Sequence, residues 1–202
     1  MSPRLVLADA VVAQPWRNGG GTTRELLQWG ARPGQPWQLR ISLASVTQGG
    51  PFSPYPGVER WFAVVEGAGV ALRLDEDAAR GVLHQLGPHS APLCFDGGVP
   101  VHCELLEGPT TDLNLMVAGG LGTMQSVLPG VPWTPRHEQA GLFACSAGQV
   151  LAPGMEALAV PERALLWFMQ APAGALSFAP LGARHDGHCG YWLGHTPRPP
   201  AH

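Results

Sequence analysis

The sequence predicts an all-β protein, and three observations support this fold class. Glycine and proline, 27 and 21 of the 202 residues, interrupt the apolar runs about every ten positions, as in antiparallel sheets. In Trp37–Leu43 every second residue is apolar, so one face of a strand is apolar and the other carries Gln38, Arg40 and Ser42. No stretch has a sustained helical period, and only Asp75–Arg80 has the pattern of a single helical turn.

Both halves of the chain contain further candidate strands. Those of the first half are Thr22–Trp29, Arg60–Val65, Gly69–Leu74, Gly81–Leu86, Val101–Leu106 and Asp112–Val117. After a glycine-rich break at 119–122, those of the second half are Gly141–Val150, Met155–Val160, Arg163–Met169, Ala175–Ala179 and Gly190–Leu193. This texture predicts two small β units, or one unit with an elaboration.

Charge and hydropathy exclude two kinds of partner. The formal net charge is −3 and its signs are scattered, whereas a nucleic-acid surface needs a basic stripe. The longest apolar stretches, Val64–Leu74 and Ala164–Met169, are too short or too interrupted to cross a bilayer. The first residues lack the apolar region of a signal peptide. We therefore expect a soluble, cytoplasmic protein that binds neither nucleic acid nor membrane.

The cysteines and histidines do not predict a metal site. The cysteines form no Cys-x-x-Cys pair and are expected to be buried free thiols: Cys94, Cys103, Cys145 and Cys189. His185, His188 and Cys189 match no common zinc spacing. A glycine-rich tail that carries histidines is the simpler interpretation, and metal binding there stays an open question.

The segment Trp16–Glu25 is the strongest candidate for a binding site. Its three glycines, Gly19–Gly21, would allow main-chain N–H groups to converge on an anion, and Asn18, Thr22 and Arg24 would add side-chain donors. The Gly-Lys-Ser/Thr ending of a Walker loop is missing. The alternative is a mobile β-turn without a ligand.

Two later segments also carry polar residues in a strand context. A proline-rich loop at 49–57 leads into a strand that ends in Glu-Gly-Ala-Gly, as around the first motif of cupin barrels, but the His-x-His metal ligands are replaced by Tyr55, Glu59 and Arg60. Alternation places Asp112 and Asn114 on one face of a strand, where they could bind a ligand or orient an arginine. A structural Asp–Arg pair that closes the barrel is the alternative for Asp112.

Four motifs occur in a characteristic order: Trp-Arg-Asn-Gly-Gly-Gly-Thr-Thr-Arg-Glu, Trp-Gln-Leu-Arg-Ile-Ser-Leu-Ala, Gly-Pro-Phe-Ser-x-Tyr-Pro-Gly-x-x-Arg and Asp-Leu-Asn-Leu-Met. From about Val12 to Met116 the chain resembles the HutD/Ves family. The resemblance implies a double cupin, with two β-barrels or jelly rolls in one chain, and an association with bacterial histidine utilisation. It implies no established reaction.

The resemblance also suggests domain limits and shows one departure. We expect a first cupin barrel at 1–118 that carries the motifs and a second at 119–202, with strands that could be exchanged between them. After Met116 the family tends to have two arginines and a glycine, whereas this chain has Val117-Ala118-Gly119-Gly120. The motif positions carried over are Trp16, Asn18, Gly19, Gly20, Gly21, Thr22, Arg24, Glu25, Arg40, Ser42, Arg60, Asp112 and Asn114.

These observations favour binding of a small carboxylate over catalysis. Arg24, Arg40 and Arg60 are expected to converge in one barrel mouth and hold a dicarboxylate. The resemblance points to urocanate or to formyl- or formiminoglutamate, bound without metal or cofactor. The expected ligand-binding residues are Asn18, Gly20, Gly21, Thr22, Arg24, Arg40, Ser42, Arg60, Asp112 and Asn114.

Two other functions are compatible with the sequence. A cupin enzyme acting on a related metabolite is the first, although Glu25 and Glu66 have no second residue to complete an acid–base mechanism and no Ser-His-Asp or Cys-His nucleophile occurs. A structural partner subunit is the second. Exposed sheet edges in cupins would also allow a homodimer.

Overall fold

The computed structural model describes residues 3–31, 37–75, 81–182 and 187–199. In this part of the chain all regular elements are β-strands except one 3-10 turn, Ala8–Ala10, so the prediction of an all-β protein is confirmed. The helical turn predicted at Asp75–Arg80 lies outside the described residues beyond Asp75. No helix in the described ranges has the length and hydropathy needed to cross a membrane.

The chain forms two compact units, called the first unit and the second unit below. The first unit is Val12–Gly119, and the second unit is Met1–Val11 together with Gly120–His202. The expected limits were 1–118 and 119–202, with a possible exchange of strands; the first eleven residues belong to the second unit and not to the first. Strand β1 (Arg4–Leu7) pairs antiparallel with β16 (Ala164–Phe168), because the edge of that sheet offers backbone N–H and C=O groups that β1 satisfies.

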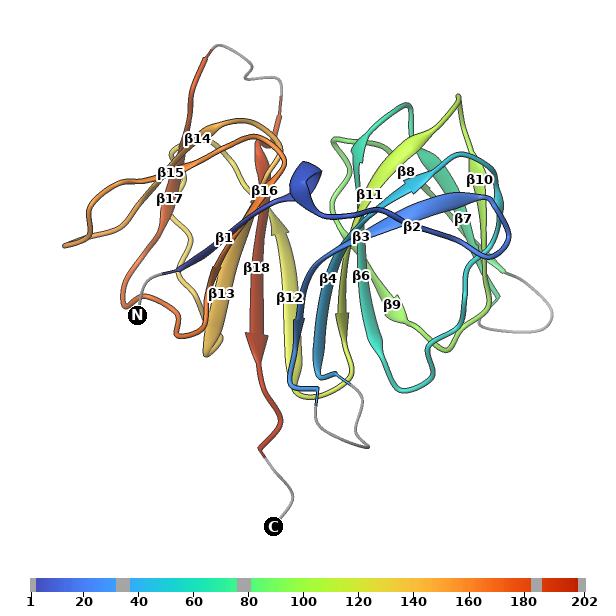
Figure 1. Ribbon diagram of the computed structural model, residues 1–202, viewed down its shortest axis with the longest axis horizontal. Coiled ribbons are helices and arrows are strands. Elements are labelled where there is room, and N and C mark those ends of the chain that lie inside the picture. Colours follow the sequence, from blue (N-terminus) through green and yellow to red (C-terminus); the bar gives the residue numbers. More distant parts are fainter. Residues whose placement is uncertain (1–2, 32–36, 76–80, 183–186, 200–202) are drawn as a thin grey trace. The chain divides into compact units, whose positions relative to one another are not determined.

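The first unit contains a six-stranded and a four-stranded sheet, seen as two layers in Figure 1. The larger has the order β2-β3-β4-β11-β6-β9, and the smaller has the order β5-β10-β7-β8. The bounds are β2 Gln14–Pro15, β3 Gly21–Trp29, β4 Leu39–Val46, β5 Gly50–Pro51, β6 Glu59–Glu66, β7 Val70–Leu74, β8 Val82–Leu86, β9 Leu93–Asp96, β10 Val101–Leu105 and β11 Thr110–Val117.

An apolar core lies between these two sheets. The six-stranded sheet contributes Phe62, Val64 and Phe95, and we call the face that carries them the inner face. The four-stranded sheet contributes the alternate residues of β7 and β10, with Leu72 and Cys103 fully buried. Period-two alternation is what makes one face of each strand apolar. Alternation also places Arg60 on the inner face, since it is two residues before Phe62.

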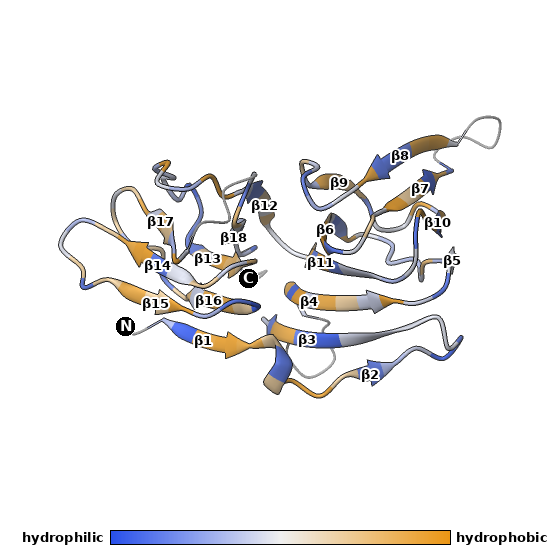
Figure 2. Ribbon diagram, turned by 90° about the horizontal axis from the view of Figure 1, so that it is seen from above, coloured by the Kyte–Doolittle hydropathy of each residue, from blue (hydrophilic) through white to orange (hydrophobic). Residues whose placement is uncertain are grey.

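The second unit has a five-stranded sheet, β1-β16-β13-β18-β12, and a three-stranded sheet, β15-β14-β17. Its remaining strands are β12 Leu121–Ser126, β13 Gln139–Ala144, β14 Gly148–Leu151, β15 Leu158–Val160, β17 Ser177–Pro180 and β18 Gly190–Thr196. Figure 2 shows that β1 changes from hydrophilic to hydrophobic along its length. The single strand predicted at Gly141–Val150 is two strands in different sheets. The Phe178 ring occupies the space where a side chain at Gly148 would lie, which fixes glycine at the start of β14.

The second unit is filled by apolar side chains. Its core includes Leu142, Leu166 and Phe178, and the Trp133 and Trp192 rings stack at a centroid distance of 5.0 Å with an interplanar angle of 2°. The candidate ligand site described below lies wholly in the first unit.

Replacing Phe178 by alanine should destabilise the second unit by about 3–5 kcal/mol, because Phe178 is fully buried and its loss leaves a cavity. Chemical denaturation followed by tryptophan fluorescence measures the change. The matched control is Leu181→Ala, since Leu181 is 67% exposed and its replacement should change the free energy of unfolding by less than about 0.5 kcal/mol. Equal effects of the two substitutions would contradict this packing.

Candidate ligand-binding site

The inner face of the six-stranded sheet opens into a cavity of about 430 Å³ with polar and apolar lining residues. This volume lies in the range of small-molecule pockets, roughly 300–1,000 Å³. The cavity is lined by Gln14, Pro15, Trp16, Arg17, Asn18, Thr23, Arg40, Ser42, Ala44, Pro51, Phe52, Ser53, Tyr55, Arg60, Asn114 and Met116.

The strand register explains how distant residues meet in this cavity. Strand β11 lies between β4 and β6, so each inner-face residue of β11 has one neighbour on each side. The first row across the three strands is Arg40, Met116 and Arg60, the second is Ser42, Asn114 and Phe62, and the third is Ala44, Asp112 and Val64. Two arginines therefore stand in one row, separated by one methionine.

Arg60 is the central side chain of the site. Its Nε and Nη2 groups both donate to Oδ1 of Asn114, at 2.9 and 2.7 Å. The guanidinium carbon lies 4.6 Å from the ring centroid of Phe52, 5.6 Å from that of Phe95 and 6.0 Å from that of Phe62. Aromatic faces stabilise a cation that is removed from water. The rings and one amide oxygen thus position the guanidinium.

Arg60 has no ion-pair partner in the part of the chain that the structure describes. The pKa of Arg60 is lowered to about 10, mainly by desolvation and also by the charge of Arg40, while Tyr55 and Asp112 oppose the shift. Arg60 is still protonated at neutral pH. An enclosed cation of this kind attracts an anion.

Arg40 is already partly compensated. Its Nε donates to Oε2 of Glu25 at 2.9 Å, and the two side chains are 19% and 35% exposed. A partly exposed pair such as this contributes modestly to stability and leaves the remaining guanidinium donors of Arg40 in the cavity wall. The wall therefore carries a net positive charge, with Arg17 at its exposed edge.

The glycine segment forms a closed turn instead of an open cradle of amides. The N–H of Gly19 donates to the carbonyl of Trp16 at 3.0 Å, and the N–H of Gly20 donates to Oδ1 of Asn18 at 3.1 Å. Gly21 accepts from the N–H of Trp16 at 2.9 Å. The hypothesis that the amides of this segment bind the anion is therefore wrong for Gly19 and Gly20, because their donors are used within the turn.

The turn has a different role, which is to place Trp16 and Asn18 at the cavity. Gly19 has a φ of +72°, a left-handed conformation that favours glycine. A side chain on Gly21 would meet the Trp16 ring and the carbonyl of Ser45. The Nε1 group of Trp16 donates to Oγ1 of Thr23 at 2.8 Å, which fixes the indole against β3.

Asp112 lies on the inner face of β11 but does not line the cavity. It is fully buried, between Ala44 of the cavity wall and Val64 of the apolar core. Oδ2 accepts from Oγ1 of Thr110 at 3.3 Å, and Oδ1 has no hydrogen-bond partner among the described residues. Burial raises the pKa of Asp112 to about 7, against the opposing effects of Thr110 and Arg60.

The structure brings together half of the ligand-binding residues expected from the sequence. The cavity wall contains Asn18, Arg40, Ser42, Arg60 and Asn114. Gly20 and Gly21 belong to the supporting turn, and Asp112 lies beneath the wall.

Thr22 and Arg24 do not join this group. They pair with Ser45 and Leu43, on the opposite face of the sheet from Thr23, which lines the cavity. The expected convergence of three arginines is thus wrong for Arg24, since a period of two separates its side chain from those of the inner face.

Sequence reasoning noted Trp16 and Tyr55 but included no aromatic side chain among the expected ligand-binding residues. Phe52 and Tyr55 lie in the proline-rich loop before β6, where no periodicity indicates which side chains point inward. Met116 was detectable, because it follows Asn114 by two residues on the same strand.

The side chains of the cavity do not fit a divalent cation. The described ranges contain no group of three or more His, Cys, Asp or Glu side chains that could hold a metal ion. The cavity presents arginine, asparagine, serine and aromatic side chains, and guanidinium groups repel a cation.

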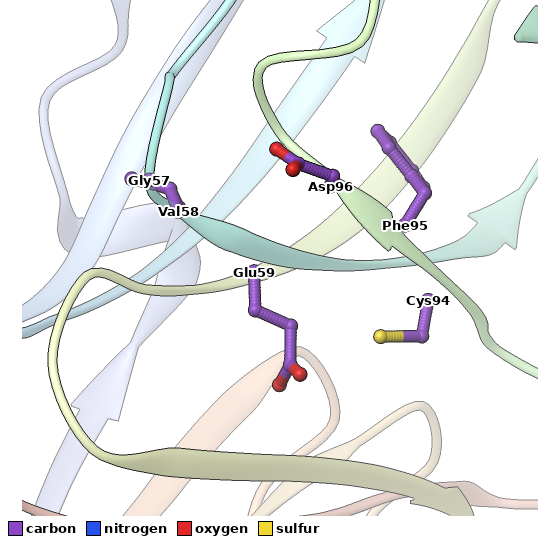
Figure 3. Close-up of a pocket in the computed structure, with 6 residues that line it drawn as sticks. All are labelled: Gly57, Val58, Glu59, Cys94, Phe95 and Asp96. Atoms are coloured by element: carbon purple, nitrogen blue, oxygen red, sulfur yellow. The ribbon is translucent and has the colours of Figure 1, made fainter. Parts of the chain in front are cut away.

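A second cavity, of about 350 Å³, lies at the beginning of β6 and the end of β9. Figure 3 shows the Glu59 carboxylate and the Cys94 sulfur on one side of this strand pair, and the Phe95 ring on the other. Partial burial and the Glu59 charge raise the pKa of Cys94 to about 11. Cys94 is an exposed thiol and not buried as predicted, yet it is protonated and a weak nucleophile at neutral pH.

The first unit thus combines a cupin-type fold with a pocket whose polar lining includes arginine and asparagine side chains. The fold of the chain is shared with oxalate decarboxylase from Bacillus subtilis, at a TM-score of 0.53 and 11% identity over 96% of this chain and 74% of that one. A HutD from Pseudomonas fluorescens SBW25, solved in a formate condition, matches with a TM-score of 0.80 and 23% identity, over 98% of this chain and 100% of that one.

The family model named HutD matches residues 8–173, and the chain belongs to the HutD family. An uncharacterised 21.2 kDa protein in the hutC 3' region of Pseudomonas putida is 33% identical over 115 residues, which are 57% of this chain and 58% of that protein. The protein Ves of Citrobacter koseri is 37% identical over 102 residues, 50% of each chain. The matched segments span little more than half the length of these curated relatives.

Asp112→Asn should stabilise the protein more at high pH than at low pH. The folded-state pKa of about 7 lies above the ordinary aspartate value of 3.8, so the stability that Asp112 contributes is full below about pH 4 and is lost as pH rises to 7. Asparagine does not ionise. From pH 5 to pH 8 the variant should therefore gain about 3 kcal/mol relative to wild type in urea denaturation. Glu107→Gln, at an exposed position, should show no such gain, and a pH-independent difference for Asp112→Asn would contradict the buried ionisation.

Glu59→Gln should accelerate alkylation of Cys94. Glutamine keeps an acceptor for Nε1 of Trp61, which donates to Glu59 at 2.9 Å, and removes the charge that raises the pKa of Cys94. Mass spectrometry of the Cys94 peptide after iodoacetamide treatment at pH 7.5 measures the rate. Wild type should react at least about tenfold more slowly than an unperturbed thiol. An equal rate in wild type and variant would show that Glu59 does not act on this thiol.

Proposed function

We propose that this HutD-family protein binds a small carboxylate metabolite of histidine utilisation and acts as an accessory or regulatory factor. The observation that carries the proposal is the geometry of Arg60. Its Nε and Nη2 groups donate to Asn114, whereas Nη1 donates to no described residue. The Arg60 side chain lines the cavity. A ligand carboxylate would supply the missing charge and accept from the free donor.

The rest of the cavity suits a metabolite with one apolar and one anionic part. Trp16, Phe52 and Tyr55 offer apolar surface, and Ser42 and Asn18 offer polar groups for a second functional group. Arg40 stands one residue away from Arg60 in the same row, so a second carboxylate could reach it. Urocanate offers one carboxylate and an aromatic ring for the apolar surface. Formyl- and formiminoglutamate offer two carboxylates, one for each arginine.

The link to histidine utilisation is supported by the relatives. One of them is named for its place in the hutC 3' region, and the family is named HutD. The proposed ligands are carboxylates of that breakdown pathway, and the arginine-lined cavity supplies the chemistry to bind them.

Binding is favoured over catalysis by the titratable groups of the cavity. Among the described residues that line it, these groups are three arginines and Tyr55. The described lining residues include no carboxylate or imidazole that could act as a general base. A cupin enzyme acting on the same metabolites is the alternative, and turnover by the purified protein would establish it.

Arg60→Gln should weaken binding of the ligand about 100-fold, because a charge-assisted hydrogen bond contributes roughly 1.5–3 kcal/mol and glutamine has no charge. Calorimetry against urocanate, N-formyl-L-glutamate and formiminoglutamate measures the affinity. The matched control is Arg24→Gln, which removes the same charge from the opposite face of the sheet and should leave the affinity unchanged. No heat with any of the three compounds, or equal losses in both variants, would overturn the proposal.

A further inference from the structure

We propose that binding of an anion at Arg60 is coupled to protonation of Asp112. When a carboxylate binds at Arg60, the protein takes up a proton at Asp112. This inference rests on the proposed function and adds a regulatory property to the same site. It is carried by the position of a buried carboxylate directly beneath the cavity wall.

Asp112 and Asn114 are successive inner-face residues of β11. The Oδ1 atom of Asn114 accepts from Arg60. The Nδ2 group of Asn114 donates to the main-chain carbonyl of Asp112 at 3.5 Å. Asp112 is fully buried, so that water cannot solvate its charge. A ligand in the cavity would therefore act on it through the electric field of Arg60 and not by contact.

The ionised form of Asp112 has little local support. Its Oδ2 accepts one long hydrogen bond from Thr110, and its Oδ1 accepts none from the described residues. An ionised carboxylate that is buried with unfilled acceptor sites is costly, and a neutral carboxyl group costs much less. The remaining support for the negative charge comes from Arg60.

The other charged or titratable groups around Asp112 leave Arg60 as the dominant cation. From β10, the Cys103 thiol is neutral because burial and the Asp112 charge raise its pKa to about 12. From β4, Arg40 is paired with Glu25 of β3. From the loop before β6, Tyr55 acts on Arg60. An anion placed on Arg60 would thus remove the main interaction that keeps Asp112 ionised.

The coupling has a defined sign. In the free protein the pKa of Asp112 is about 7, held down by Arg60, and a carboxylate at Arg60 would raise it. Binding then takes up protons between the free and bound pKa values. Affinity should rise as pH falls through this window, by up to about tenfold per pH unit, and level off once Asp112 is protonated in both states.

The test begins without any ligand. Protein labelled with ¹³C at the aspartate carboxyl carbon is titrated between pH 5 and pH 9 by NMR, and the Asp112 signal is assigned by its loss in Asp112→Asn. We expect a midpoint near neutral pH that moves upward in Arg60→Gln and stays near the wild-type value in Arg60→Lys. If Arg60→Gln does not fold, Arg60→Met replaces it. No titration of Asp112, or the same midpoint with and without the cation, would overturn the coupling.

Calorimetry then separates this inference from the proposed function. N-formyl-L-glutamate is titrated at pH 7 in two buffers that differ in ionisation enthalpy, which gives the number of protons taken up. Wild type should take up a measurable fraction of a proton and Asp112→Asn none, with binding retained. Binding without proton uptake in wild type would overturn the coupling alone. Absence of binding by every proposed ligand would overturn the proposed function, while the NMR titration still decides the coupling.

Discussion

A guanidinium group held away from bulk water is the constraint on which the site depends. A cation in such a place needs acceptors and polarisable surface, and the fold supplies them with Asn114 and the ring of Phe52. Neither supplies a negative charge. The cavity next to Arg60 therefore has a positive electrostatic potential. The fold brings these side chains together from β6, β11 and a loop.

The sequence predicted the parts of this arrangement that follow from a single strand. Alternation placed Arg40 and Ser42 on one face of β4, and Asp112 and Asn114 on one face of β11. The motif order of the family then indicated that these strands share a cupin-type fold, which the structure confirms. A period of two needs no knowledge of distant contacts, so the spacing of these residues along the chain is enough to select them.

The remaining parts depend on contacts that no local pattern encodes. Arg24 was expected in the cavity, yet alternation alone does not tell which face of β3 points inward. Phe52 reaches Arg60 from a loop without periodicity. The pairing of β1 with β16 joins segments far apart in sequence. The environment of Asp112 is of the same kind, because its burial depends on how three strands and the opposite sheet pack.

The most direct test of the account is an NMR titration of the arginine side chains with N-formyl-L-glutamate. Protein labelled with ¹⁵N-arginine reports each guanidinium group, and the signals of Arg60 and Arg24 are assigned by substitution. The account predicts that the ligand shifts the Arg60 signals and leaves those of Arg24 unchanged, because Arg60 lines the cavity and Arg24 lies on the opposite face of the sheet. Binding that shifts Arg24 and leaves Arg60 unchanged would contradict it.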